Sequence, residues 1–381
     1  MPETAPAAMI LTSRTDTKPA PKPDPAAPGR RTRRLSVEIR QHAPGWLQAA
    51  ALAGGLVVGL ICAAALLVAA GVSLSDLAQE FVVSILTSPE SLAAVLTQAA
   101  PLSIIGLAAA IAFRVRFWNV GIEGQMIGGA IAATAVALAD LGPEPLRLVL
   151  MGLAAALGGA LWMLGPTLLR LRLGLNEIIS TLLLNYVAFN GLLHLLYGPW
   201  RDPESNFPNS ALFSSPERLA DLGWQNLTYA LPLAVVLMLA GWWLINLSRF
   251  GFLMRVAEAN PRLGRAQGLP MTGVVLAATL LSGALAGVAG FAICAGVEHR
   301  LTQSFAAGYG FSGILIAFLA RNNPLAVLVV AFAVGMLFVA GQSLQVFYQI
   351  PSSAVQLVQA LIVLCVAASD FFIRHRLRWI D

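Results

Sequence analysis

The sequence predicts an all-α, polytopic integral membrane protein with about ten transmembrane helices and both termini in the cytoplasm. Hydrophobic residues make up 57% of the 381 residues, and charged residues only 11%. Soluble domains carry about 25% charged residues, so an ordinary soluble fold is excluded. Long apolar runs recur along the chain, and most have the length that crosses a bilayer.

The expected spans are apolar stretches separated by polar turns. They lie near Trp46 to Ala70, Ser88 to Phe113, Trp118 to Ala139, Leu146 to Leu169, Leu175 to Tyr197, Leu227 to Leu247, Met271 to Gly296, Gly308 to Arg321, Leu325 to Ala340 and Ala354 to Phe372. The eighth is short enough to be re-entrant. We count it as a span because Arg321, Arg374, Arg376 and Arg378 then all lie inside, as basic residues usually do.

These spans divide the chain into three parts. Residues 1–42 are rich in Pro, Ala, Thr and Arg and are expected to form a disordered cytoplasmic tail. Residues 43–373 form the transmembrane domain, and 374–381 form a second cytoplasmic tail. Within the domain, 198–226 is expected to be an extracytoplasmic loop and 248–270 a cytoplasmic one.

Charge and rare residues exclude several functions. The net charge of +5 comes from 24 basic and 19 acidic residues, and the arginines at the ends of apolar runs indicate orientation in a bilayer rather than nucleic-acid binding. Lys18 and Lys22 are the only lysines, and neither follows a glycine-rich loop, so the chain has no phosphate-binding loop of its own. No metal site or disulfide framework is expected, because the cysteines and histidines are scattered, at Cys62, Cys294, Cys365, His42, His194, His299 and His375.

The 248–270 loop carries the strongest positional signal, with four arginines: Arg249, Arg255, Arg262 and Arg265. Such loops stay on the cytoplasmic side. Asn260 and Pro261 predict the start of a short helix on the membrane face. Two interpretations remain open: a solvated connector that fixes topology, or a helix that docks a cytoplasmic partner.

Polar residues inside two spans form the second signal. Asn119, Glu123 and Gln125 lie in NVGIEGQM, where the first two share a helix face if that start is helical. A stripe at four-residue spacing runs down the fifth span, through Glu177, Thr181 and Asn185. These side chains either join helices or line a transport path. Our hypothesis is that Thr181 and Asn185 line the path, while Glu123 and Glu177 hold its inner end together.

Glycines at helical spacing predict close contacts between helices. The first span has Gly55 and Gly59, four residues apart. The seventh span has Gly283, Gly287 and Gly290. No serine, histidine and acid constellation accompanies these helices, so a membrane hydrolase is disfavoured, and few mid-span charges argue against a proton pump.

Four blocks together resemble the permease subunits of nucleoside and simple-sugar ATP-binding-cassette (ABC) importers. They are AAPLSIIGLAAAIAFRVRFWNVGIEGQM from Ala99, NEIISTLLLNY from Asn176, RVAEANPRLGRAQG from Arg255 and GYGFSGILIAFLARNNP from Gly308. They look closer to the nucleoside-type branch than to the ribose-type branch. One departure is that Arg116, Phe117 and Trp118 stand where the family usually has small residues.

The resemblance implies a transport subunit in the bacterial inner membrane, with no catalytic site and no cofactor of its own. ATP and Mg would bind to a separate cytoplasmic ATPase. Other implied partners are a second, different permease subunit, an extracytoplasmic binding protein and membrane lipid, but no nucleic acid. The ATPase-coupling residues implied by the family pattern are Arg255, Glu258, Asn260, Pro261, Arg262, Gly264 and Gly268.

Three alternatives stay open at this point. Within the same class, the substrate would be a simple sugar rather than a nucleoside. In a different class, the chain would be an ion-coupled secondary carrier, which often has interrupted helices and buried acids. A scaffold or receptor that uses the outer loop is the third, and no feature of the sequence favours it.

Overall fold

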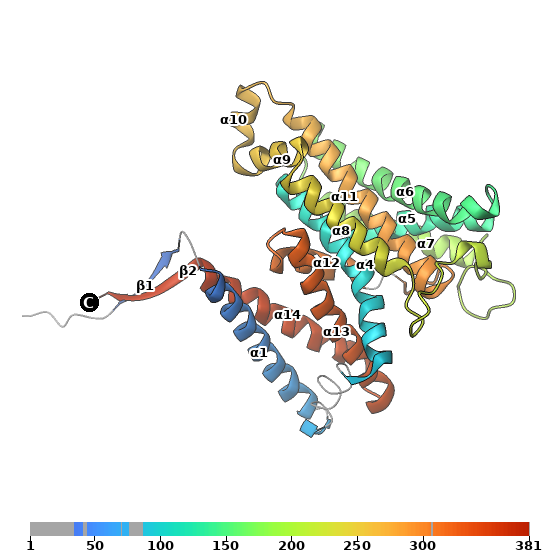
Figure 1. Cartoon of the computed structure of the whole chain (residues 1–381), viewed down its shortest axis with the longest axis horizontal. Coiled ribbons are helices and arrows are strands. Elements are labelled where there is room, and N and C mark those ends of the chain that lie inside the picture. The colour runs from blue at the N-terminus through green and yellow to red at the C-terminus, as the bar shows by residue number, and fades with distance from the viewer. Residues whose placement is uncertain (1–33, 41–43, 70, 76–86, 306–307, 381) are drawn as a thin grey trace, which may run out of the picture. The chain divides into compact units, whose positions relative to one another are not determined.

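The computed structural model describes the chain except for residues 1–33, 41–43, 70, 76–86, 306–307 and 381 (Figure 1). Helices dominate: α1 (Gly45–Ala69), α4 (Pro89–Arg114), α5 (Ile122–Leu138), α6 (Glu144–Leu173), α7 (Glu177–Tyr197), α8 (Ala230–Asn246), α9 (Arg249–Ala259), α10 (Pro261–Ala266), α11 (Met271–Ile293), α12 (Tyr309–Leu319), α13 (Pro324–Tyr348) and α14 (Ser352–Arg374). A 3₁₀-helix, η2 (Ser215–Glu217), and a π-helix, η3 (Cys294–Glu298), are also present, and two strands are β1 (Arg34–Ile39) and β2 (His375–Ile380).

The chain divides into two compact units, one of residues 43–373 and one of 1–42 with 374–381. In the smaller unit, β1 and β2 pair antiparallel, with Leu35 opposite Trp379 and Val37 opposite Leu377. The larger unit is all-helical, as predicted, whereas residues 34–39, which were expected in a disordered tail, form strand β1. Apolar residues alternate with polar ones in both segments, which is a strand pattern. The rest of the expected tail, 1–33, lies outside the described residues.

Each of the ten apolar segments corresponds to one helix, but the helices are not all long enough to cross a bilayer. Six helices are long and apolar enough to cross a membrane. The number rises to seven if α8 and α9, which are bent by 66° relative to each other, are counted together as one span. The shorter apolar helices are α5, α12 and the Ser353–Ser369 part of α14. The expected number of about ten spanning helices is thus reduced to six or seven among the described residues.

The eighth expected span, α12, is too short to cross a bilayer as a helix. α12 has 11 residues and is therefore about 16 Å long, about half of a hydrocarbon core. It runs beside α4 from Gln98 to Arg114: the Tyr309 hydroxyl contacts Gln98, and Arg114 donates to the Asn322 carbonyl at 3.1 Å. Gly308, with φ of 81°, precedes its first turn. This segment is a half-length helix rather than a full helical span.

The bundle core forms where α11 meets α6 and α5. A Cβ at Gly283 would lie 2.6 Å from the Gly159 carbonyl oxygen, and one at Gly287 would overlap the carbonyl oxygen of Ala155. At Gly290 a Cβ would overlap the backbone of Met126 on α5. Small residues at these points let the helix backbones approach closely, which is how membrane helices gain contact without a hydrophobic driving force.

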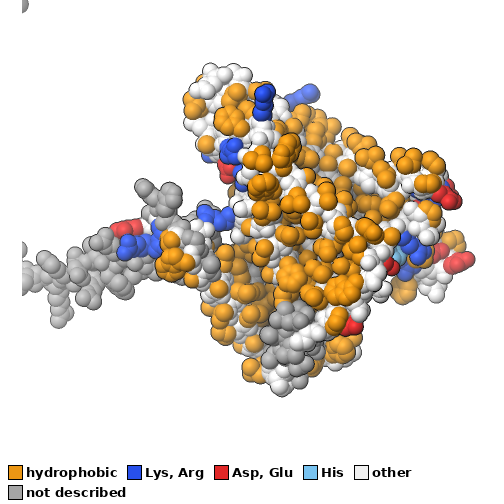
Figure 2. Space-filling model, in the orientation of Figure 1, with side chains coloured by type: hydrophobic (Ala, Val, Ile, Leu, Met, Phe, Trp, Pro, Cys, Tyr) orange, Lys and Arg blue, Asp and Glu red, His pale blue; other side chains and the backbone are white. Residues whose placement is uncertain are grey.

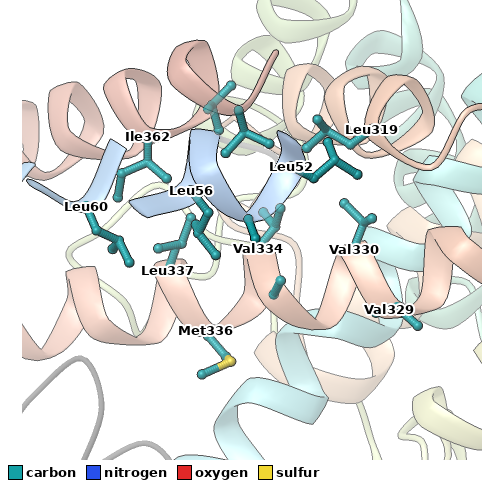
Figure 3. Close-up of a pocket in the computed structure, with 14 residues that line it drawn as sticks. Leu52, Leu56, Leu60, Leu319, Val329, Val330, Val334, Met336, Leu337 and Ile362 are labelled. Carbon is teal, nitrogen blue, oxygen red and sulfur yellow. The ribbon is translucent and has the colours of Figure 1, made fainter. Parts of the chain in front are cut away.

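α1 also packs against α14 through glycines that allow close contact. A Cβ at Gly55 would lie 2.8 Å from Ser369 Cβ, and one at Gly59 would lie 2.9 Å from Ile362 Cα. Between α1, α13 and α14 lies a pocket of about 330 Å³ lined by aliphatic side chains, among them Leu56 and Leu337 (Figure 3). Because no hydrogen-bonding side chain lines it, this pocket offers nothing to a polar solute.

The surface of the larger unit matches a membrane environment. Figure 2 shows hydrophobic side chains over most of this face of the bundle, with charged side chains gathered toward its ends. Many large apolar side chains are exposed, such as Leu161 at 67% and Val329 at 70%. A surface of this kind is stable in lipid and would aggregate in water.

Candidate functional site

The bend between α8 and α9 begins the arginine-rich element. Ser248 caps α9, its hydroxyl accepting a hydrogen bond from the Gly251 backbone N–H at 3.0 Å. A Cβ at Gly251 would overlap the carbonyl oxygen of Ile245, so this position requires glycine. Arg255 also donates to the Ile245 carbonyl, at 3.4 Å. The turn from α8 into α9 is thus fixed by local contacts.

Asn260 ends α9 and starts α10. Its side-chain oxygen accepts hydrogen bonds from the backbone N–H groups of Arg262 and Leu263, both at 3.1 Å. Pro261 occupies the first helical turn, where its missing N–H has no cost. The sequence predicted a helix start here, and the structure has one. The segment differs from the expectation in being two helices rather than one.

α10 folds back onto the start of α11. Gly264 is buried, and a Cβ there would lie 2.9 Å from Met271 Sδ and 3.1 Å from Val256 Cγ1. Gly268, with φ of 76°, makes the turn into α11. The opposite face of the pair carries exposed side chains of Arg262, Arg265 and Leu263, the last 54% exposed. We refer to α9 and α10 together as the α9–α10 pair.

Arg116 connects this pair to the bundle. Its guanidinium donates to the backbone carbonyl of Glu258 at 2.7 Å and to that of Ala259 at 3.1 Å. These are terminal carbonyls of α9, where a cation is favoured by unpaired acceptors and by the helix dipole. The Glu258 side chain is exposed, so this residue takes part through its backbone. Sequence reasoning noted Arg116 only as a departure from a family pattern.

A second contact leads from Arg116 to α6 and α7. Arg170 donates to the Arg116 carbonyl at 3.0 Å, forms an ion pair with Glu177, and lies 5.2 Å over the ring of Phe117. The Trp118 backbone N–H lies 3.4 Å from a Glu177 carboxylate oxygen. Glu177 therefore joins the end of α6 to the residues that precede α5. The links from the α9–α10 pair to α5, α6 and α7 converge on residues 116–118.

Asn119 lies before α5, so the expectation that it shares a helix face with Glu123 is wrong. α5 begins at Ile122, because Asn119 forms tertiary hydrogen bonds instead of continuing a helix. Its amide donates to Gln125 at 2.9 Å and to Ser282 on α11 at 3.1 Å, and Gln125 donates back at 2.8 Å. Glu123 instead lies beside the start of α12, with its Cβ 2.7 Å from the Cβ position of Gly310.

The polar stripe of α7 bonds to the start of α5. The Thr181 hydroxyl accepts from the Val120 N–H at 3.3 Å. The Asn185 amide accepts from the Gly124 N–H at 2.8 Å and donates to the Val120 carbonyl at 3.0 Å. The N-terminal N–H groups of a helix lack partners inside it, and these side chains supply them. This geometry favours the helix-joining interpretation for Thr181 and Asn185 over the path-lining one.

The connection from α7 to α8, residues 198–229, is held by a buried ion pair that sequence reasoning missed. Arg147, 8% exposed, donates to Asp140 at 2.7 Å and to Glu217 at 3.0 Å. Glu217 also accepts from the Ser214 N–H at 2.7 Å, in a capping box. The capping box could have been predicted from the sequence, because Ser214 is followed three residues later by Glu217. We call this connection the 198–229 segment.

The 198–229 segment also bonds to the region after α11. Phe213 N–H donates to the His299 carbonyl at 2.8 Å, and Leu219 N–H donates to the Ala295 carbonyl at 2.9 Å. The pKa of the His299 ring lies below its ordinary value, first because of burial and second because of Arg218, with Asp221 opposing. Figure 1 shows this segment and the α9–α10 pair at opposite ends of the bundle.

The fold and the site together define a multi-pass helical membrane protein. Its helices pack closely at glycines, and polar segments at the two ends of the bundle are bonded to those helices. The chain belongs to the family described as branched-chain amino acid transport system / permease component, which matches residues 91–367. It is accordingly an ABC transporter permease component of the nucleoside and sugar type, and it is not itself catalytic.

Three relatives illustrate the range of the family. The chain is 35% identical to the glucose ABC transporter permease protein TsgB13 of Haloferax volcanii, over 90% of this chain and 93% of that protein. It is 32% identical to the guanosine ABC transporter permease protein NupP of Bacillus subtilis, over 71% and 79%. It is 25% identical to the guanosine ABC transporter permease protein NupQ of the same bacterium, over 74% and 91%. Since relatives occur in archaea and bacteria, the similarity does not assign this chain to a bacterial inner membrane.

Proposed function

We propose that this chain is the membrane-spanning subunit of an importer that carries nucleosides across the cytoplasmic membrane by alternating access. A separate ATPase, which binds ATP and Mg, supplies the energy by closing against the α9–α10 pair. The observation that carries this proposal is the junction at residues 116–118, through which the pair is bonded to α5, α6 and α7. Movement of the pair would therefore reach several bundle helices at once.

The α9–α10 pair has the features of a docking element. Arg262, Arg265 and Leu263 present charge and apolar area on its exposed face, while Gly264 and Asn260 hold its buried face and its turn. Its arginines support a cytoplasmic location. The coupling role of Arg255, Glu258, Asn260, Pro261, Arg262, Gly264 and Gly268 is part of this proposal.

The bundle offers a place for the rocking motion. α11 crosses α6 at Gly283, Gly287 and Gly159, where the two backbones approach closely, and we place the pivot of the motion at this small-residue contact. Alternating access then requires only that the ATP-bound and ATP-free assemblies favour different crossing geometries. Nothing covalent happens to the solute.

The pore is proposed to include a second, different permease subunit. Support comes from Bacillus subtilis, in which two distinct guanosine permease proteins, NupP and NupQ, both resemble this chain. An extracytoplasmic binding protein would deliver the solute to the 198–229 segment. That segment is firmly bonded to the bundle through Arg147 and Phe213, as a docking platform should be.

A simple sugar is the second candidate substrate. The observation that favours it is the 35% identity to the glucose permease TsgB13 over 90% of this chain. Nucleosides remain our proposal because the NVGIEGQM and NEIISTLLLNY blocks resemble the nucleoside-type branch. Both candidates are uncharged solutes rich in hydroxyl groups.

The Gly264→Trp variant tests the coupling role. A large side chain there meets Met271 and Val256, so α10 is pushed away from α11. In vesicles with the reconstituted ATPase, we expect nucleoside uptake to fall at least tenfold while ATP hydrolysis continues. Gly273→Trp is the matched control, since a Cβ at Gly273 has no neighbour within 4 Å. Equal uptake by Gly264→Trp and wild type, at equal copurification of the ATPase, would contradict the proposal.

A further inference from the structure

A second hollow lies at the end of the bundle where the 198–229 segment is found. It has a volume of about 520 Å³, within the range of small-molecule sites. Three separate parts of the chain line it: α7, residues 207–209 and residues 302–304. The side chains that matter for binding are Phe189, Phe207, Asn209, Thr302, Gln303 and Ser304.

Backbone hydrogen bonds hold the walls of this hollow in place. Ser210 N–H donates to the Leu301 carbonyl at 3.0 Å, and Leu301 N–H donates to the Ser210 hydroxyl at 2.9 Å. Asp202 N–H donates to the Asn209 carbonyl at 2.9 Å. Because both connections are tied to each other, the hollow is preformed, and a ligand would not have to order it.

Four polar side chains around the hollow have unused hydrogen-bonding capacity. Thr302 is 6% exposed, and its hydroxyl has no hydrogen-bond partner. Buried hydroxyls are nearly always bonded, so this one indicates a missing partner. In the part of the chain that the structure describes, the side chains of Asn209, Gln303 and Ser304 also make no hydrogen bond. Together they offer amide and hydroxyl donors and acceptors to a bound solute.

Two phenylalanines complete the lining. Phe207 is 71% exposed and Phe189 is 39% exposed, so their rings have open faces on which a flat ring can stack. None of the residues that line the hollow is charged. The lining therefore offers no cation to pair with an anionic solute such as a nucleotide or a sugar phosphate.

We propose that this hollow is the site where the membrane subunit first contacts a nucleoside, with the base against Phe189 and Phe207 and the ribose hydroxyls on Thr302 and the neighbouring amides. This assignment rests on the proposed import function and adds a location and a recognition chemistry to it. The base supplies the flat ring that the aromatic side chains accommodate, and the hydroxyls satisfy the Thr302 oxygen. A simple sugar would meet these rings only with the C–H groups of its own ring, and it lacks the flat aromatic surface that a base supplies.

Photolabelling of the purified full-length chain in detergent, with radiolabelled 8-azidoadenosine, tests this site. We expect label on peptides containing residues 207–209 or 302–304, and displacement by excess adenosine but not by equal glucose. Phe207→Ala and Thr302→Val should each reduce labelling at least tenfold. Thr302→Ser, which keeps the hydroxyl, and Leu212→Ala, which changes an exposed side chain in the same segment, should retain it.

The outcomes separate this site from the import function. Label on other peptides, or labelling unchanged in Phe207→Ala and Thr302→Val, overturns the site even if wild-type vesicles import nucleosides. Displacement by glucose as effective as that by adenosine overturns the nucleoside assignment. Failure of the wild-type chain to copurify with an ATPase overturns the import function, whatever the labelling shows.

Discussion

The α9–α10 pair and the 198–229 segment, at opposite ends of the bundle, are attached to it in contrasting ways. The α9–α10 pair contacts the bundle through the exposed guanidinium of Arg116 and through Gly264, which packs near Met271. The segment is fixed by the buried Arg147–Glu217 ion pair and by backbone bonds to residues after α11. This contrast fits the proposed function, in which one end would transmit movement and the other would hold a fixed surface.

The largest expected effect is at the fixed end. Arg147→Met leaves the Glu217 carboxylate buried without its cation, and breaking one side of a buried pair costs about 3–5 kcal/mol. We expect a clear fall in the thermal unfolding midpoint in detergent. Asp140→Asn is the control, because the Asp140 side chain is 74% exposed and such contacts are worth about 0–1 kcal/mol. Equal shifts for the two variants would show that the buried pair does not hold the segment.

The next effect is at the α9–α10 pair. Arg116→Gln removes the contacts to the terminal carbonyls of α9, so we expect several-fold less uptake per ATP hydrolysed. Stability should change by only about 1 kcal/mol, since the bonds lost are exposed. Arg172→Gln, at the exposed end of α6, serves as the control. If Arg116→Gln kept wild-type transport, the junction at residues 116–118 would not be the route of coupling.

The smallest effect is a pH dependence of the 198–229 segment. The pKa of His299 is lowered in the folded protein, mainly by burial, so below its ordinary value of about 6.5 the unfolded chain binds more protons than the folded one. Stability should therefore fall as the pH drops through 6.5, and the loss should be complete below the folded pKa.

Unfolding midpoints at pH 7.5 and 5.5 measure this dependence. His299→Gln removes the titrating group, so the difference between the two midpoints should shrink in the variant. The charged neighbours Arg218 and Asp221 remain in both proteins. An unchanged difference would assign the pH dependence to other groups.

The sequence located the helices because apolar length and capping residues are local properties. All ten apolar segments contain a helix, and Asn260 caps a helix as predicted. The start of α5 was misplaced because the Asn119 side chain bonds to Gln125 and, across the bundle, to Ser282, and the second partner is not visible from the local sequence. The apolar run of α12 was seen to be short, but it was counted as a span because that choice places Arg321 and the terminal arginines inside.

The candidate site was only partly visible beforehand. The spacing of Glu177, Thr181 and Asn185 indicated one helix face, and that face contacts residues 118–124. Arg116 and Arg147 could not be recognised, because their importance comes from carbonyls and carboxylates far away in the chain. The hollow near Phe207 was equally hidden, since its three walls meet only in the folded protein.

Accessibility of single cysteines in intact cells tests the central claim most directly. In a chain with Cys62, Cys294 and Cys365 replaced, Arg265→Cys in the α9–α10 pair and Arg201→Cys in the 198–229 segment are treated with a membrane-impermeant maleimide. The account predicts that the cysteine at 201 is labelled at once and that the one at 265 is labelled only after the cells are permeabilised. Labelling at 265 in intact cells would contradict it, because the α9–α10 pair could not then reach a cytoplasmic ATPase.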